Sequence, residues 1–181
     1  KDHLARITDE EVLETISENK EKVPEKKSKS GIIVKGLYDV AVHFSKCCSP
    51  VPGDEIVGFV TRGRGVSIHR TDCINIINLS DMERERLIDA EWQHDEESGS
   101  SGLYLAEIKV FCNNRTGLLV DITRAFTERE IDINAIHSKT SKQGIATIDI
   151  SFNTKGKAEL TSVIDKLRQI DSIIDIERTT G

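Results

Sequence analysis

Three of the four cysteines in this chain fall between positions 47 and 73, and this clustering constrains the fold more than any other feature. Cys47 and Cys48 are adjacent and precede the run Pro50-Val51-Pro52-Gly53-Asp54. Further on, His69 and Cys73 have the spacing His-x-x-x-Cys, which is compatible with a structural zinc site. Thiolate sulfur and imidazole nitrogen are donors that zinc prefers. The pattern therefore predicts a zinc site made of Cys47, Cys48, His69 and Cys73.

Two other interpretations of these residues are open at this point. Adjacent cysteines rarely both bind one ion without strain, so the cysteines are alternatively small buried hydrophobic residues beside a hydrogen-bonded His69. A third interpretation is a thiol redox switch, which requires a depressed pKa and rapid alkylation of Cys47 or Cys48. His43 is a spare candidate ligand, although its position also fits an ordinary strand residue.

Composition indicates a globular chain with a highly charged surface, because 37% of its 181 residues are hydrophobic and 31% are charged. The sequence has neither the roughly 20 consecutive apolar residues of a membrane span nor a signal peptide. Because adjacent cysteines do not make a secreted disulfide framework, we expect a reducing cytoplasm. The net charge of −6 argues against indiscriminate nucleic-acid binding but is compatible with a local basic patch.

The apolar pattern divides the chain into four parts. In order, these are a helical end and flexible linker (1–30), a small finger domain (31–92), a flexible acidic and Gly/Ser connector (93–102) and a second domain (103–181). The finger domain is expected to be mixed α/β, with strands at 32–34, 40–44, 56–60, 66–69 and 87–92 and a helix at 71–77. About sixty residues make a marginal core, and domains of that size often use a metal.

The second domain has a regular order of elements. Alternating and helical periodicities predict strands at 106–112, 131–140, 145–152 and 173–178, with helices at 118–129 and 160–167. The order β-α-β-β-α-β is typical of a ferredoxin-like sandwich whose sheet is covered on one face. The fold class is therefore α+β.

Two further segments are candidate binding sites. Arg62, Arg64 and Arg70 lie around Gly63 and Gly65, and guanidinium groups beside flexible backbone can contact RNA phosphates. The simpler alternative is that these arginines are solvated.

In the second domain, the residues before the first helix, 113–119, offer backbone N–H groups that can hold a carboxylate, or they simply cap the helix. The chain carries no P-loop and no nucleophile elbow, so we expect no catalytic activity of its own.

The residues from Gly31 to Cys73, with Cys47-Cys48-x-Pro50-x-Pro52-Gly53-Asp54, resemble the zinc-finger (ribosome–intersubunit) domain of long RelA/SpoT-type alarmone synthetase/hydrolases. Residues 103–180 are similar to the ACT domain of the same proteins. In that domain, Asn114-Arg115-Thr116-Gly117-Leu118-Leu119 stands in the place of the family's Asp-Arg-x-Gly-Leu-Leu. Asn114 replaces the usual Asp and removes a charge that could hold an ammonium group.

The resemblance implies the C-terminal regulatory region of a cytoplasmic (p)ppGpp synthetase/hydrolase (GTP pyrophosphokinase), with the catalytic domains upstream. It implies that the finger contacts ribosomal RNA on ribosomes that carry deacylated tRNA. It also implies an ACT domain that either joins those ribosome contacts or forms a homodimer and binds a branched-chain amino acid, valine or isoleucine.

The site residues follow from the resemblance by position. The finger residues would be Cys47, Cys48, His69 and Cys73, the RNA-facing residues Arg62, Arg64 and Arg70, and the effector loop Asn114, Arg115, Thr116, Gly117, Leu118 and Leu119, facing Ile133 and Asn134. One alternative is an amino-acid sensor and dimerisation module with a purely structural finger. The other is the redox switch.

Overall fold

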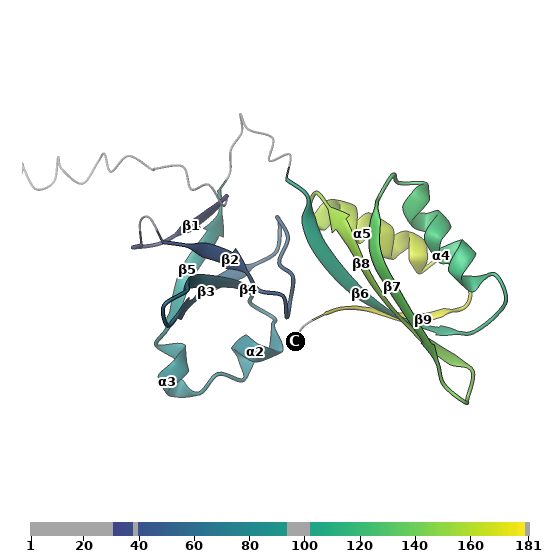
Figure 1. The fold of residues 1–181 in the computed structure, drawn as a ribbon, viewed down its shortest axis with the longest axis horizontal. Helices are drawn as coiled ribbons and strands as arrows, with labels where there is room; N and C mark the ends of the chain where they lie inside the picture. Colours follow the sequence, from purple (N-terminus) through teal and green to yellow (C-terminus); the bar gives the residue numbers. More distant parts are fainter. Residues whose placement is uncertain (1–30, 38–39, 94–101, 180–181) are drawn as a thin grey trace, which may run out of the picture.

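The computed structural model describes residues 31–37, 40–93 and 102–179, which form two sheets (Figure 1). The helical end and linker predicted for residues 1–30 lie outside the described residues, as does most of the predicted connector. The strands are β1 (Ile32–Val34), β2 (Val42–Phe44), β3 (Ile56–Thr61), β4 (Gly65–Arg70), β5 (Leu87–Trp92), β6 (Tyr104–Asn113), β7 (Ile133–Thr140), β8 (Ile145–Thr154) and β9 (Ile173–Arg178). The helices are α2 (Ile74–Ile77), α3 (Asp81–Arg84), α4 (Leu118–Thr127) and α5 (Lys157–Leu167).

The first sheet has the strand order β1-β5-β3-β4-β2. A hairpin of β3 and β4 forms its centre, β5 pairs antiparallel with β3, and β2 pairs in parallel with β4. All five predicted strands of this domain are present, and the predicted helix is limited to α2. The acidic stretch that begins at Asp81 contains α3, which a capping box between Ser80 and Glu83 starts.

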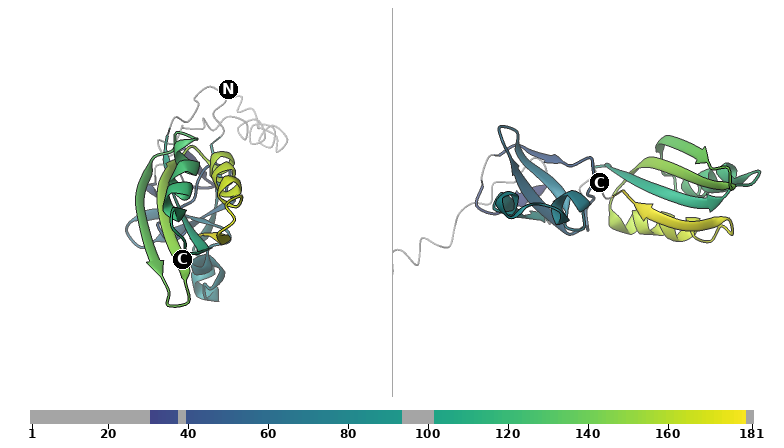
Figure 2. Two further views of the ribbon diagram at one scale, coloured as in Figure 1. Left: turned by 90° about the vertical axis from the view of Figure 1, so that its right-hand side faces the viewer. Right: turned by 90° about the horizontal axis from the view of Figure 1, so that it is seen from below.

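The second sheet has the order β7-β8-β6-β9, and α4 and α5 both cover one of its faces (Figure 2). This confirms the predicted βαββαβ order and the one-sided sandwich. Side chains alternate in burial along β6 and β8, as a strand with one buried face requires. Phe126 of α4 and Phe152 of β8 meet edge to face in this core, with ring centroids 5.0 Å apart.

Three apolar clusters hold the described residues together. One lies within the first sheet, one surrounds Cys48, Cys73 and Ile76, and the largest fills the second domain. The largest cluster also contains Val51, a residue of the loop that links β2 to β3 in the first domain. The two domains therefore share a core residue as well as a boundary.

Candidate functional site: a Cys/His cluster beside the domain boundary

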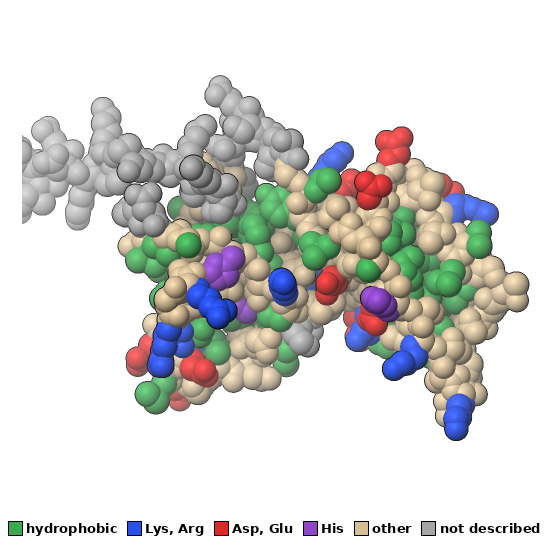
Figure 3. Space-filling view, viewed as in Figure 1, with side chains coloured by type: hydrophobic (Ala, Val, Ile, Leu, Met, Phe, Trp, Pro, Cys, Tyr) green, Lys and Arg blue, Asp and Glu red, His purple; other side chains and the backbone are tan. Residues whose placement is uncertain are grey.

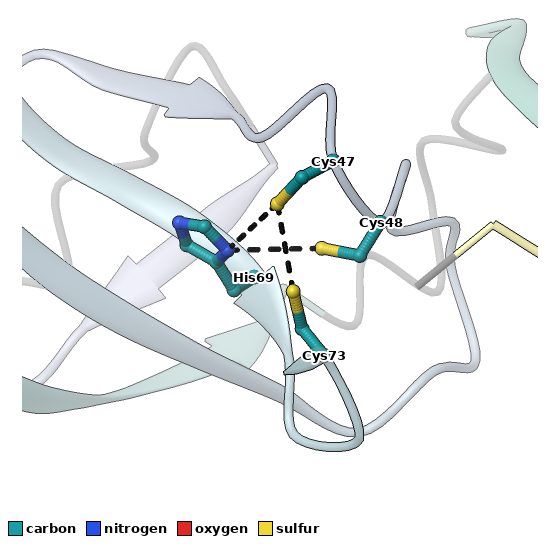
Figure 4. A group of neighbouring side chains, drawn as sticks. All are labelled: Cys47, Cys48, His69 and Cys73. Carbon is teal, nitrogen blue, oxygen red and sulfur yellow. Dashed lines mark hydrogen bonds between the residues drawn. The ribbon is translucent and has the colours of Figure 1, made fainter. Parts of the chain in front are cut away.

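The structure brings the four predicted metal ligands together. One ligand atom from each of Cys47, Cys48, His69 and Cys73 lies within 4.8 Å of all the others. Figure 4 shows the three thiols turned toward Nδ1 of His69, which lies 3.4 Å from Sγ of Cys47 and 3.8 Å from Sγ of Cys48. Sγ of Cys47 is also 3.5 Å from Sγ of Cys73. His43 is exposed on β2 and is not a member of this cluster.

Strand pairing explains why these residues meet. Because β2 and β4 run parallel with Phe44 opposite Ile68, the residues that follow each strand emerge at the same end of the sheet. Cys47 and Cys48 lie in the turn after β2, and His69 lies near the end of β4. Cys73 follows at the start of α2. The order of strands, rather than proximity in sequence, builds the site.

The backbone conformation explains how two adjacent cysteines can both point toward one centre. The turn closes with a hydrogen bond from the Ser49 N–H to the Ser45 carbonyl, 3.0 Å long. Ser49 takes a φ of 41°, in the left-handed region that a non-glycine residue rarely adopts. This turn presents the thiols of Cys47 and Cys48 to the same centre, which an extended chain would send to opposite sides.

Burial and hydrogen bonding set the protonation of the cluster. Burial raises the pKa of the Cys48 thiol to about 12 and also raises the pKa of the Cys73 thiol. Although burial opposes it, hydrogen bonds from Ser45 and Asn75 lower the pKa of the Cys47 thiol. Burial lowers the pKa of His69 and so favours the neutral imidazole, the form that binds a metal.

This donor set fits a tetrahedral metal ion. Three sulfurs and one imidazole nitrogen match the Cys₃His sites that hold structural zinc. The other ring nitrogen of His69, Nε2, lies 3.3 Å from Oγ of Ser67, a contact that would fix the ring with Nδ1 toward the ion. A bound ion would hold the thiols as thiolates, against the effect of burial on Cys48 and Cys73.

The predicted RNA-facing arginines divide into two groups. Arg62 and Arg64 are exposed on the β3–β4 turn. Figure 3 shows basic side chains and histidines on the surfaces of both domains. Arg70 is only 6% exposed. It forms an ion pair with Asp72, and its Nη1 donates to the carbonyls of Cys48 and Thr179, at 3.4 and 3.5 Å.

The prediction that Arg70 faces RNA is therefore corrected. Along β4, Arg70 shares the inward face with Val66 and Ile68, and its guanidinium is engaged by protein oxygens. Arg62 and Arg64 alone remain candidates for phosphate contact.

The predicted effector loop borders a shallow cavity of about 180 Å³ in the second domain. Its lining is Asn114, Arg115, Gly117, Leu118, Leu119, Val120, Ser138 and Ile148. Gly117 begins α4 with a φ of 80°, which glycine adopts readily. Arg115 is anchored by Asp121, 2.6 Å away, and by Oγ of Ser172, 2.5 Å away. Thr116 is exposed but does not line the cavity.

Ile133 and Asn134 do not face this loop, contrary to the prediction. Both β6 and β7 pair antiparallel with β8, so they run in the same direction, and the end of β6 is level with the end of β7. The loop after β6 therefore meets Ser138 near the end of β7. At the other end, Ile133 pairs with Phe152, and the Asn134 side chain bonds to Asn153.

Sequence reasoning missed the charged pair at the domain boundary. Arg178 of β9 donates to both carboxylate oxygens of Asp54, at 2.7 and 2.9 Å, and to the Ser49 carbonyl at 3.2 Å. The sequence pattern could have indicated that Arg178 needs a partner, because alternation along β9 places it on the same face as the buried Ile176. A charged residue on a buried face needs a partner.

Comparison with known proteins identifies both domains. Residues 32–93 match the family model of the RelA/SpoT RIS domain, and residues 100–178 match an ACT domain model. The GTP pyrophosphokinase of Escherichia coli K12 is 38% identical over 91% of this chain and 22% of its own length. That of Streptomyces coelicolor is 38% identical over 83% of this chain and 17% of its own length.

A solved structure is also similar to part of this chain. The ACT domain from the GTP pyrophosphokinase of Chlorobium tepidum is 27% identical, covers 42% of this chain and 99% of its own, and has a TM-score of 0.39.

Across the described residues, every helix is too short or too polar to cross a membrane.

A β-rich domain with a Cys/His cluster, followed by a βαββαβ sandwich, thus defines a RIS–ACT pair. The chain belongs to the RelA/SpoT family and comprises its regulatory RIS and ACT domains. It spans about a fifth of the length of the curated relatives that it matches, at 22% of the protein from Escherichia coli and 17% of that from Streptomyces coelicolor.

Proposed function

We propose that this chain is a non-catalytic regulatory module that acts on GTP pyrophosphokinase and (p)ppGpp hydrolase activities located elsewhere in a longer cytoplasmic protein. Its inputs would be the state of the ribosome and its tRNA, and a branched-chain amino acid at the ACT domain. The family relationship supports this proposal, because the curated relatives are GTP pyrophosphokinases of which this chain matches only the RIS–ACT part.

The observation that carries the proposal for the RIS domain is the convergence of four ligand atoms within 4.8 Å. A zinc ion held there by Cys47, Cys48, His69 and Cys73 would contribute folding energy to a domain with a small core. It would also fix the end of β4, and with it the exposed hairpin that carries Arg62 and Arg64. Those two arginines would contact the phosphates of ribosomal RNA.

For the ACT domain, the cavity beside Gly117 supports binding of a small amino acid. The start of α4 supplies N–H groups suited to a carboxylate. Leu119 and Val120 are large apolar side chains that are 45% and 58% exposed at the cavity, where they could contact a branched aliphatic chain or a second copy of the domain. A homodimer through this domain is part of the proposal.

Two alternatives have an observation in their favour. A module that mainly senses amino acids and dimerises, with a structural finger, accounts for the cavity and for the burial of Arg70. A thiol redox switch accounts for two properties of the half-buried Cys47. Its thiol lies next to that of Cys73, and hydrogen bonds lower its pKa against the effect of burial.

The test combines metal analysis with titration calorimetry on one preparation of residues 1–181. We expect one zinc per chain and saturable heat with valine or isoleucine but not with lysine. Zinc without amino-acid binding would leave the ribosome as the main input. Amino-acid binding without zinc would favour the sensor with a purely structural finger. Absence of both, with rapid alkylation of Cys47, would favour the redox switch.

A further inference from the structure

The loop that leaves the Cys47–Cys48 turn is packed into the ACT domain. Within this docking loop, defined here as residues 49–54, Val51 is 0% exposed and belongs to the apolar core of the second domain. Burying a valine in a neighbouring domain removes apolar surface from water only while the two domains are in contact. The loop is therefore a structural part of the ACT core.

Polar contacts hold the same loop in place. The Pro52 carbonyl accepts a hydrogen bond of 2.8 Å from the Lys157 N–H. This N–H lies in the first turn of α5, where backbone N–H groups have no acceptor within the helix. Asp54 pairs with both terminal nitrogens of Arg178, and its own loop is closed by a 2.9 Å bond from the Val51 N–H to its carboxylate. The loop is thus fixed to two elements of the ACT domain, α5 through Pro52 and β9 through Asp54.

The fit at this contact depends on two glycines. A Cβ at Gly156 would lie 2.9 Å from the Pro52 carbonyl oxygen. A Cβ at Gly53 would lie 3.0 Å from Cβ of Lys157, and the φ of Gly53 is +97°. Backbone on both sides approaches too closely for a larger side chain, so the contact requires one shape of the loop.

Residues next to the Cys/His cluster take part in this contact. Ser49, the first loop residue, is held by the closed turn that contains Cys47 and Cys48, and its carbonyl accepts from Arg178. On the other ligand-bearing strand, Arg70 follows His69 directly. Its N–H donates to Sγ of Cys48, and its guanidinium bridges the carbonyls of Cys48 and Thr179. Two ligand segments therefore continue straight into contacts with the ACT domain.

We propose that the docking loop couples metal binding at the cluster to attachment of the ACT domain. This inference rests on the proposed zinc site. With the ion bound, the Cys47–Cys48 turn is closed and presents Val51 and Asp54 to the ACT domain. When the ion leaves, the turn loses the centre that orients both thiols, the loop withdraws, and the ACT domain separates from the RIS domain.

The chain contains its own reporter of this state. Trp92 is the only tryptophan, and its indole N–H donates to the carbonyl of Asp54 at 2.9 Å. Its ring stacks on Phe44, at 5.6 Å between centroids, and meets Tyr104 of the ACT domain edge to face at 5.8 Å. Separation of the domains would expose this ring to water and shift its emission to longer wavelength.

The experiment uses residues 1–181 with zinc loaded, and then with zinc removed by a chelator and the removal verified by metal analysis. Trp92 emission and the radius of gyration from X-ray scattering are recorded in both states. We expect a red shift and a larger radius after removal. Val51→Asp should show both changes with zinc still bound, whereas Met82→Asp, at an exposed position of α3, should show neither.

Coupling is reciprocal, which provides a second measurement that does not need a folded metal-free protein. If docking and metal binding are linked, Val51→Asp and Asp54→Asn should raise the zinc dissociation constant by about tenfold, and Met82→Asp should leave it unchanged. Unchanged zinc affinity in both loop variants, or a compact zinc-free protein, would overturn the coupling alone. A chain that binds no zinc at all would overturn the zinc proposal together with this inference.

Discussion

Asp54 and Arg178 are 124 positions apart and form a two-point ion pair across the boundary between the RIS and ACT domains. The pair is buried, with side-chain exposures of 4% for Asp54 and 15% for Arg178. A buried pair does not have to raise the net stability, because both charges lose their hydration. Its geometry does make the relative position of the two domains specific, since only one arrangement satisfies both charges.

Removing one partner should be costly. In Arg178→Gln the carboxylate of Asp54 stays buried without its cation, and we expect the free energy of unfolding to fall by about 3 kcal/mol. Urea unfolding followed by Trp92 emission measures this. Lys109→Gln breaks an exposed pair with Asp149 and should cost less than about 1 kcal/mol. Equal losses in the two variants would show that the Asp54–Arg178 pair is not effectively buried in solution.

The β3–β4 hairpin allows a matched comparison of two glycines. Gly63 and Gly65 have φ values of 81° and 79°, so alanine is strained at both. A Cβ at Gly63 meets nothing within 4 Å, whereas one at Gly65 would lie 2.0 Å from the Ala41 carbonyl oxygen. Gly65→Ala should therefore lose at least about 2 kcal/mol more than Gly63→Ala. Similar unfolding midpoints for the two variants would contradict the close contact between this hairpin and Ala41, the residue before β2.

The elements of the ACT domain were accessible from the sequence because each depends on a local periodicity. The last strand was predicted at 173–178 and is observed as Ile173–Arg178. Gly117 was recognised at the start of α4. Which part of β7 faces this glycine was not predictable in the same way, because it depends on the pairing register of β6, β7 and β8.

The ligand residues of the site in the RIS domain were predictable from the chemistry of their donor atoms. The strand pairing that brings these residues together was not predictable. Nothing local to Phe44 and Ile68 indicates that β2 and β4 pair in parallel, yet this pairing brings Cys47 and Cys48 to His69. The burial of Arg70 could have been predicted, because side chains alternate between the two faces of β4 and Arg70 falls on the face of Val66 and Ile68. Its neighbourhood of glycines and arginines suggested phosphate binding instead, so tertiary packing overrode a composition signal.

Arg64 and Arg70 should respond differently to the same substitution. Arg64→Ala should weaken binding to ribosomal RNA and reduce the salt dependence by about one phosphate contact, with little loss of stability. Arg70→Ala should mainly lower the unfolding free energy, because its guanidinium bonds to Cys48 and Thr179. Filter binding across a salt series separates the two effects, with Arg168→Ala on the ACT domain as a charge-matched control. A loss of RNA affinity in Arg168→Ala as large as in Arg64→Ala would argue against a specific contact.

The effector cavity is tested at Gly117. Gly117→Trp should fill the space between the loop and α4 and abolish the heat of valine or isoleucine binding. Gly36→Trp is the control, because Gly36 has a similar φ of 82°, lies in the RIS domain and has nothing within 4 Å of the position of a Cβ. Retained binding in Gly117→Trp would place any amino-acid site elsewhere, and lost binding in both variants would point to a general effect on folding.

The central claim is that Cys47, Cys48, His69 and Cys73 form one metal site, and cobalt(II) titration followed by absorption tests it most directly. We predict one cobalt per chain, intense visible bands of a tetrahedral ion with thiolate charge-transfer bands in the near ultraviolet, and displacement of both by zinc. Cys48→Ser and His69→Ala should weaken or remove this spectrum, and Cys112→Ser, at a buried cysteine of the ACT core, should preserve it. The weak absorption of a six-coordinate ion, or bands that persist in Cys48→Ser and His69→Ala, would contradict the account.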